Sequence, residues 1–477
     1  MLKIIFSLVF TIIALNAFTQ DANYWSSNYG VGGFLAPGAT IAKNGDSGVL
    51  FYNPALIAYN TKNAASISGN FYNLRSTKIK NGAGTGLHLR STHASVIPFI
   101  AANTIYLKLK SPITFAYALM NNPVTNFAAS QRKDVQQNVL HDSYSPGKEV
   151  FVGQYVLSNY IHETTGLLAF AKPLSSKIAV GLSLGINLRK QTYLTDFSSK
   201  TLTNDTSSLS QKLVTVSDYY LVNNVTVGLG IKVGLSYDLA PRRHIGLMAS
   251  LPMIGLYSSG DLLTDFSIAN LQLNTTELFL FASGRQTKLK ANWKTPLSVA
   301  AGYTYDYRKG QIYFAVEYFD KVKQYNLVQP RNEKFIRPDT GNVSGFTSQL
   351  LRLKDEHKPI INFALATSFS IKDKLTGYFS LRTNFNYLAS GLFTNVEGYR
   401  ANIGIWDMYH MQIGANFKKR KFNMRAGILL SYGSAGDYMQ DVNFDNPNEN
   451  NYLVGDRHAT RATEVSAGLM FAYIYNF

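Results

Sequence analysis

The 477-residue sequence predicts an all-β protein, a transmembrane antiparallel β-barrel of about fourteen strands. Three observations support this fold class. Apolar residues occupy every second position over many segments, these segments are long enough to cross a bilayer, and the connections between them alternate between short and long. After residues 1–20, no stretch is apolar enough over its whole length to predict a membrane helix.

The alternation is clearest over residues 178–189, where Ile, Val and Leu share one face of the predicted strand and mostly small or polar residues share the other. Residues 225–236 and 361–370 repeat the pattern. A slip of one residue would move every side chain to the opposite face, so the pattern also specifies the strand register. Such stretches reach about ten residues, the length of a tilted membrane strand, whereas soluble strands average about five to six. Strand length therefore favours a membrane barrel over soluble sandwiches or a large lectin.

The order of connections supports a single-chain bacterial barrel, in which short turns lie at one rim and long loops at the other. An even number of strands places both chain ends at the periplasmic rim. We expect strand centres near residues 69, 95, 117, 160, 184, 230, 250, 300, 316, 365, 381, 412, 428 and 470. The expected short turns are 172–177, 240–244, 308–310, 372–374 and 418–421, and the expected long loops are 128–149, 197–211, 259–290, 328–358, 390–404 and 434–461.

Residues 1–20 predict a secretory signal peptide. Lys3 precedes an apolar stretch over residues 4–15, and the small residue Ala17 follows. An N-terminal membrane anchor is the alternative, but the stretch is shorter than the roughly 20 residues that a spanning helix needs. The mature chain is therefore expected beyond the inner membrane, in the Gram-negative outer membrane as a multi-pass barrel.

Composition excludes several classes of protein. The chain has no cysteine, which excludes a disulfide-stapled domain, a thiolate metal site and an acylated lipoprotein. The net charge of +17 comes from dispersed cations without stacking aromatics between them, so we expect outer-membrane lipids rather than nucleic acid as partners. The eight histidines lack metal-ligand spacing, and no nucleophile elbow or phosphate-binding loop is present. We therefore expect no metal, no cofactor and no enzyme activity, with an outer-membrane hydrolase kept as an alternative.

In residues 464–477 alternate positions form an apolar face that carries several aromatics, small or polar residues such as Ser466, Gly468 and Asn476 lie on the other face, and the segment ends on Phe477. This segment resembles the carboxy-terminal signal by which outer-membrane barrels are recognised for insertion. The resemblance implies the barrel-assembly machinery as a partner. The alternative is an ordinary amphipathic edge strand that ends at an aromatic belt residue.

A Gly/Ala-rich segment over residues 28–50 leads to Phe51, Tyr52, Asn53, Pro54 and Ala55, directly before the first expected strand. The segment resembles the start of the FadL-type family of outer-membrane long-chain fatty-acid and hydrocarbon transporters. The resemblance implies a small N-terminal hatch in the lumen, and thus a signal peptide over 1–20, a hatch over 21–60 and a barrel over 61–477. Small residues can pack closely inside a lumen, and Pro54 ends regular structure before the strand. A plain turn is the alternative for residues 53–55.

The third expected strand loses its alternation at Asn121, Asn122 and Pro123, and proline cannot donate to a sheet ladder. In the FadL-type family the third strand is kinked inward beside a lateral opening. The resemblance implies that these three residues form that kink. Alternatively, the strand ends here and an external loop begins.

Two further groups of residues are candidate ligand contacts. The expected loop 259–290 is unusually apolar, and part of it fits a helix that offers ligand a first binding groove, as the resemblance implies; packing that closes the barrel top is the alternative. Four cations share the expected luminal face, where they would meet a substrate carboxylate or pair with luminal acids such as Glu317. The loop residues are Leu271, Leu278, Phe279 and Phe281, and the cations are Arg189, Lys232, Arg382 and Arg425.

These observations predict a monomeric outer-membrane transporter for long-chain fatty acids, hydrocarbons or similar hydrophobic small molecules, with a hatch-plugged barrel and a lateral opening. The alternative is a FadL-shaped barrel that acts as a partner protein in secretion or surface assembly. Composition and periodicity predict the barrel, whereas the transported molecule is implied by the family resemblance alone.

Overall fold

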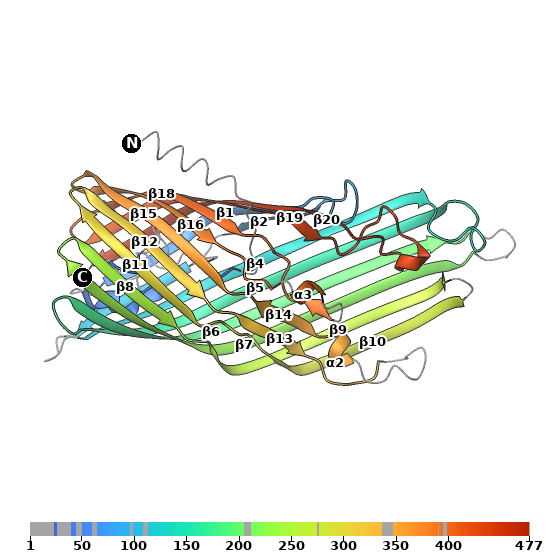
Figure 1. Ribbon diagram of the computed structural model, residues 1–477, viewed down its shortest axis with the longest axis horizontal. Helices are drawn as coiled ribbons and strands as arrows, with labels where there is room; N and C mark the ends of the chain where they lie inside the picture. Colours follow the sequence, from blue (N-terminus) through green and yellow to red (C-terminus); the bar gives the residue numbers. More distant parts are fainter. Residues whose placement is uncertain are drawn as a thin grey trace.

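The computed structural model describes residues 23–25, 40–43, 50–59, 64–95, 99–107, 113–204, 211–273, 276–335, 347–389, 391–394 and 398–476. The predicted signal peptide lies outside these residues. The described strands close into a fourteen-stranded antiparallel barrel (Figure 1), which confirms the predicted fold class and strand number. Around the barrel the strands are β1 (Ala64–Ile79), β20 (Ala459–Asn476), β19 (Phe422–Met439), β18 (Met408–Lys418), β16 (Leu375–Asn384), β15 (Ile360–Lys372), β12 (Gly310–Phe319), β11 (Ser298–Tyr307), β8 (Arg243–Ser250), β7 (Leu213–Ala240), β6 (Ile178–Leu202), β5 (Glu149–Pro173), β4 (Ile113–Gln137) and β3 (Phe99–Leu107).

The first and last strands close the barrel. β1 pairs with β20 along its whole length, from Ala64 opposite Asn476 to Ile79 opposite Ala462, and its first residues also pair with β3. The C-terminal end lies at the short-turn rim, opposite the long external extension (Figure 1). All five expected short turns join consecutive barrel strands at this rim.

Each barrel strand presents two different faces. In β15, Leu365 is 51% exposed on the outside of the barrel, while Ala364 and Ala366 are buried on the inside. β5 and β6 repeat this arrangement, with Leu168 and Ile186 outside and Ala169 and Ser183 inside. The apolar outer surface is the one that a bilayer requires, so the chain is a transmembrane barrel of the outer-membrane type.

The second expected strand is interrupted. β2 (Leu89–Ser95) pairs with residues 73–79 of β1, towards the external side. β3 pairs with residues 64–68 of β1, near the short-turn rim, and with β4. Within the described residues no backbone ladder joins β2 to β4. Side-chain hydrogen bonds connect them instead, including one from the Ala128 backbone N–H to Ser91 Oγ at 3.1 Å.

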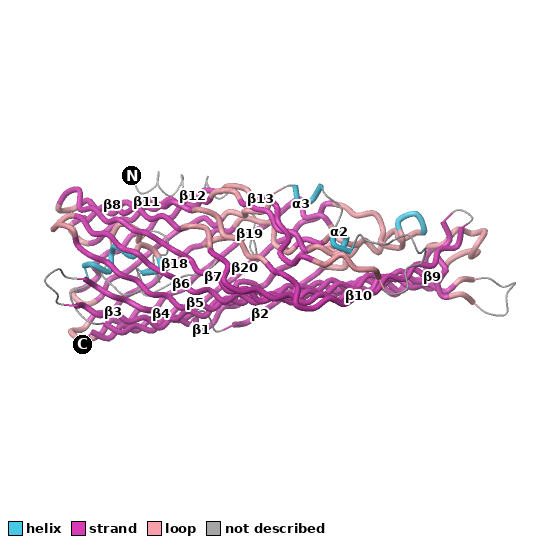
Figure 2. Tube along the Cα trace, turned by 90° about the horizontal axis from the view of Figure 1, so that it is seen from below, coloured by secondary structure: helices cyan, strands magenta, loops and turns pink. Residues whose placement is uncertain are grey.

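The expected loop 259–290 is instead a β-hairpin, so the prediction of a loop with a helical part is wrong. β9 (Ile254–Leu273) pairs with residues 215–229 of β7, and β10 (Thr276–Ala291) pairs with β9. β4 and β6 likewise continue beyond the expected strand ends to Gln137 and Leu202. Together, β4–β7, β9 and β10 form a sheet that extends beyond the rest of the barrel (Figures 1 and 2).

Short elements lie on the external side of the barrel. β13 (Val322–Gln329), β14 (Leu353–His357) and β17 (Tyr399–Arg400) form a second small sheet, accompanied by α2 (Thr347–Leu350), α3 (Gly391–Thr394) and η3 (Glu449–Asn451). Among the described residues, none of the helices has the length and apolarity needed to cross a membrane.

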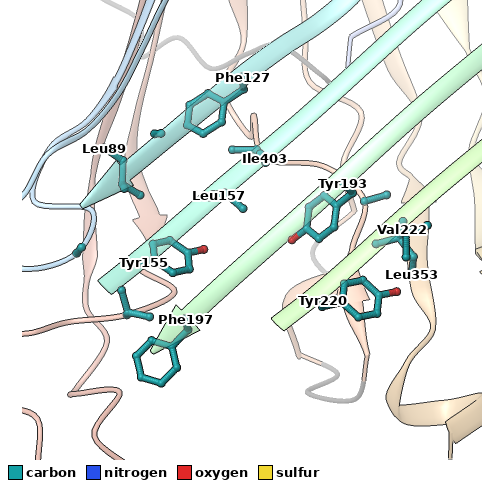
Figure 3. Packing of buried hydrophobic residues seen from close by; sticks show 14 of the residues in the cluster. Leu89, Phe127, Tyr155, Leu157, Tyr193, Phe197, Tyr220, Val222, Leu353 and Ile403 are labelled. Carbon is teal, nitrogen blue, oxygen red and sulfur yellow. The ribbon is translucent and has the colours of Figure 1, made fainter. Parts of the chain in front are cut away.

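The inner face of the extended sheet is covered by a hydrophobic core. Tyr155, Phe197 and Tyr220 project from three successive strands and pack against external connections that include Leu353 and Ile403 (Figure 3). The Phe197 ring also stacks on Phe444, with the ring centroids 6.2 Å apart. External connections therefore pack across the inner face of the extended sheet at the external end of the described lumen.

The outward position of Leu365 generates a stability prediction. Leu365→Arg should lower the free energy of unfolding in lipid vesicles by about 2–4 kcal/mol, because it places a cation on the membrane-facing surface. The control Asn450→Arg adds the same charge to an exposed external loop and should change the free energy by less than about 0.5 kcal/mol. Equal effects in urea titrations would contradict the membrane placement of Leu365.

Candidate functional site

The segment before β1 lies inside the barrel. Its described part includes residues 50–59 and the short helix η2 (Pro54–Tyr59), which contacts β4, β5, β6 and β7. Leu50, Leu56 and Ile57 are completely buried, in one cluster with luminal side chains of the wall. Of the predicted hatch, residues 21–22, 26–39, 44–49 and 60 lie outside the described residues.

Glycines on the barrel wall make room for this segment. Gly181 and Gly234 face each other across β6 and β7. A Cβ atom on Gly181 would lie 2.4 Å from the Ala55 backbone nitrogen, and one on Gly234 would lie 2.0 Å from Asn53 Oδ1. Gly246 and Gly302 form a second opposed pair, and their Cβ atoms would collide with Ile41 and Ala42. These glycines therefore create a flat surface against which the backbone of the segment packs.

Asn53 holds the segment together. Its Nδ2 donates to the carbonyl oxygens of Ile41 and Leu235 at 2.8 and 3.0 Å, and its Oδ1 accepts from the Ala55 N–H at 3.0 Å. Asn53 thereby joins two parts of the segment to β7. Lys232 Nζ adds a hydrogen bond to the Phe51 carbonyl at 2.9 Å. The predicted residues Phe51, Tyr52, Asn53, Pro54 and Ala55 thus occupy one site, and their role as a hatch stays a prediction.

A cavity of about 270 Å³ adjoins the segment in the lumen. Aromatic surface comes from Trp25, Trp293 and Phe319, together with Phe51 and Tyr52 of the segment. Charged groups also line the cavity, and they come from four different strands. They are Glu163, Lys232, Glu317 and Arg382.

The position of the cavity can be followed along β5, which runs from the external side to the short-turn rim. Phe151 and Tyr155 belong to the external core, Glu163 and Thr165 line the cavity, and Ala169 packs on the N-terminal segment. The cavity therefore lies between two packed regions, with the external core on one side and the N-terminal segment on the other.

The four predicted luminal cations all lie on the inside of the wall, but their partners differ. Arg189 pairs with Glu163, and its guanidinium lies 4.8 Å from the centroid of the Trp293 ring. Arg425 Nε donates to Asn416 Oδ1 at 3.4 Å. Lys232 and Arg382 line the cavity, whereas Arg189 and Arg425 do not. For Arg189, pairing with a luminal acid is the observed arrangement.

Glu317 faces the cavity with both carboxylate oxygens engaged. Oε2 accepts from Trp25 Nε1 at 2.6 Å, and Oε1 accepts from Ser298 Oγ at 2.7 Å. The bond to Trp25 fastens a second part of the N-terminal region to the wall. The sequence offered no signal for this contact, because Trp25 and Glu317 are nearly three hundred residues apart.

The predicted kink residues lie where the wall changes its pairing. β4 does not end at Asn121, Asn122 and Pro123, because the strand continues to Gln137. The last pair between β3 and β4 joins Phe99 and Asn121, and the register between β4 and β5 shifts after Pro123. The interruption of the sequence pattern therefore marks a bulge and the end of a ladder, and its role in transport stays a prediction.

Arg75 bridges this part of the wall, and sequence reasoning missed it. From β1 its Nη1 donates to the Val124 carbonyl on β4 at 3.3 Å, while its Nε lies 3.3 Å from Glu464 Oε1 on β20. Farther along, Asn126 Nδ2 and His93 Nε2 are 2.8 Å apart. Side chains rather than a backbone ladder thus link β4 to its neighbours over this stretch.

The four predicted apolar loop residues belong to β9 and β10. Leu271 is buried in the external core, and Leu278 packs against that core. Phe279 and Phe281 are exposed. The structure therefore brings the first pair into the packing that closes the barrel and leaves the second pair on the surface of the hairpin.

No family model matches the sequence, and no curated protein matches it. Solved structures do match. A FadL homologue from Pseudomonas aeruginosa is 10% identical with a TM-score of 0.57, over 94% of this chain and 100% of the other. The toluene transporter TodX from Pseudomonas putida is 13% identical with a TM-score of 0.56, over 96% and 100%, and the toluene transporter TbuX from Ralstonia pickettii is 11% identical with a TM-score of 0.53, over 94% and 99%.

The chain is a transmembrane β-barrel with the fold of the FadL-type barrels. The predicted resemblance is confirmed at the level of the fold, across nearly the whole chain. The two toluene transporters named above share this architecture.

The fit between Gly181 and the N-terminal segment generates a second prediction. Gly181→Ala should displace residues 53–55, because the added methyl group meets backbone atoms that have no rotamer to change. The chain has no cysteine, so a single Ala55→Cys probe reports this site alone. We expect maleimide to label the probe roughly tenfold faster when Gly181→Ala is present. This factor corresponds to a loss of about 1.4 kcal/mol in the free energy that holds the segment packed against the wall.

Gly166→Ala is the matched control, since a Cβ at Gly166 meets nothing within 4 Å. Labelling should be unchanged in that variant. Slow labelling in both variants would show that the segment tolerates the methyl group and is not fixed by the glycine surface.

Proposed function

We propose that the chain is a FadL-type outer-membrane transporter of long-chain fatty acids or similar hydrophobic molecules. The observation that carries the proposal is the luminal cavity between the external core and the N-terminal segment, where aromatic side chains and cations face the same space. The shared fold of the hydrocarbon and FadL-type barrels supports the same reading.

The cavity lining suits a molecule with an apolar body and one anionic group. Trp293, Phe319 and Met248 offer apolar surface, while Lys232 offers an ammonium donor. Glu317 already accepts two hydrogen bonds, so it is less available than Lys232 to a polar ligand. A charge-assisted hydrogen bond in a partly dry lumen is stronger than a neutral one.

Ligand binding would also act on the N-terminal segment. Lys232 donates to the Phe51 carbonyl, and a carboxylate is a stronger acceptor than a carbonyl. A bound carboxylate would therefore compete for Lys232 and weaken one of the bonds that hold the segment against β7. This competition links occupation of the cavity to release of the hatch.

The lateral route would use the wall near Asn121, Asn122 and Pro123. The β3–β4 ladder ends at Asn121, and beyond it β4 is held to β1 and β2 by side chains such as Arg75. Side-chain contacts can break without opening a backbone ladder. In the described wall, the strands of this stretch therefore separate at the lowest cost in free energy.

The partner-protein function remains the second candidate, because one feature favours it. The extended sheet ends in the hairpin of β9 and β10, where Phe279 is exposed outside the barrel. A transporter has no evident need for this projecting apolar surface. Mass spectrometry of the gently purified protein, beside an unrelated barrel, separates the candidates. Enriched fatty acids or hydrocarbons support transport, whereas an empty lumen with stable protein partners supports the second function.

A ligand-binding prediction follows from Lys232. Lys232→Met should weaken binding of a long-chain fatty acid roughly ten- to a hundredfold, because it removes a hydrogen bond to a charged group worth about 1.5–3 kcal/mol. Binding of a neutral alkane of equal length should change less than about twofold, and Lys232→Arg should keep most of the affinity for the acid. Equal loss for acid and alkane would indicate damage to the cavity rather than loss of a carboxylate contact.

The lateral route yields a further prediction. Cysteines in place of His93 and Asn126, joined by a short bifunctional methanethiosulfonate, should hold β2 to β4 and reduce uptake at least about tenfold until a reductant cleaves the link. The control link joins Ser76→Cys and Thr92→Cys, which already face each other in the β1–β2 ladder. Uptake that is unaffected by the first link, with cross-linking shown by mass, would exclude a route through this stretch.

A further inference from the structure

A second apolar space lies on the opposite side of the wall from the N-terminal segment. It is a groove of about 860 Å³ on the membrane-facing surface, and it crosses β20, β1, β3, β4, β5, β6 and β7. Its walls are large outward side chains, including Leu119, Leu168 and Ile186. Its floor includes the small residues Ala65, Ala101 and Gly166. A Cβ at Gly166 would meet nothing within 4 Å, which shows how open the floor is.

The groove is almost entirely hydrocarbon in character. Its main polar side chains satisfy each other or the backbone, since Asn103 Nδ2 donates to the Tyr117 hydroxyl at 3.2 Å and Ser66 Oγ donates to the Ala102 carbonyl at 3.3 Å. Six inter-strand spacings of about 4.8 Å give the groove a span of roughly 29 Å. These features fit a long alkyl chain that lies across the strands.

Only a single layer of β-sheet separates the groove from the N-terminal segment. Ala102, Ala118 and Leu167 contribute to the groove and also pack, on the luminal side, in the cluster that contains Leu50 and Leu56. The groove begins immediately below the last pair of the β3–β4 ladder, since residues 101–103 and 117–119 line it and the ladder ends at Phe99 and Asn121. It is therefore continuous with the stretch of wall that the lateral route would use.

We infer that this groove is a second binding site, on the membrane side of the wall, for the alkyl chain of the transported ligand. The inference rests on the proposed function. A ligand that leaves the lumen beside Asn121 enters the groove directly and lies along β3 to β7 before it mixes with bulk lipid. The groove thus holds the departing chain against the barrel wall before the chain disperses among the membrane lipids.

Photocross-linking tests the site in lipid vesicles that contain the full chain. A fatty acid with a terminal diazirine should label peptides that carry Tyr117, Leu119 or Leu168, and also luminal peptides such as the one with Trp293. Outward residues on the far side of the barrel, including Leu365 and Ile413, measure the background from dissolved ligand. Groove labelling should exceed this background at least about tenfold, which corresponds to a preference of about 1.4 kcal/mol for the groove over the surrounding lipid.

Gly166→Trp should fill the groove and remove the groove labels while the luminal labels persist. Gly436→Trp is the matched control, because a Cβ there also meets nothing within 4 Å. Ala101→Leu is a second, milder variant that narrows the same floor, and it should lower groove labelling in proportion.

The outcomes separate the two proposals. Luminal labels with groove labels at background would overturn the groove and leave the transport function intact. Absence of labels at both sites would overturn the transport function itself. A phosphatidylcholine with the same diazirine chain forms the last comparison, and if it labels the groove as strongly as the fatty acid, the occupant is a membrane lipid and the inference is wrong.

Discussion

Closure of the backbone hydrogen-bond ring is the constraint on which the structure depends. In a bilayer no water can satisfy an exposed N–H or C=O group, so a sheet must close on itself. β1 meets this requirement by pairing with β20 on one side and with β3 and β2 on the other. Two places in the described chain lack part of this pairing: the external hairpin, which extends beyond the barrel, and the stretch between β2 and β4. Only the second interrupts the wall, and there Arg75, Ser91 and Asn126 supply side-chain contacts.

The lumen shows a second constraint, which is one of space. A fourteen-stranded barrel is too wide for its inward side chains alone to fill, so the interior is occupied by added segments. External connections form a hydrophobic core at one end, and the N-terminal segment packs on glycines at the other. The luminal cavity, with its aromatic and charged lining, lies between these regions. The strands that present small residues to the segment on the inside also line a groove on the outside.

The sequence predicted the barrel well because the period of two is a local property that each strand repeats. Most strand positions and the inward position of Arg189 and Lys232 followed from it, whereas the expected centres at residues 95 and 250 fall at the ends of β2 and β8. The hairpin of β9 and β10 was missed, because the apolar side chains of residues 259–290 were interpreted as part of a helix in a loop. One of them, Leu271, instead packs in the external core from a strand. The contacts of Arg75 and the bond between Trp25 and Glu317 were missed for another reason. The paired residues lie far apart in the chain, and only the closed barrel brings them together.

The pairing of β1 with β20 also has a consequence for how the molecule reaches this state. The two strands are nearly four hundred residues apart, so their contact closes the largest loop in the chain and carries the greatest loop-closure entropy. Neighbouring hairpins can assemble earlier, since each joins through a short turn. Until the final strand arrives, the growing sheet has two exposed edges and an N-terminal segment without its complete enclosure. Biogenesis of this protein therefore needs an environment that shields both edges until the ring can shut.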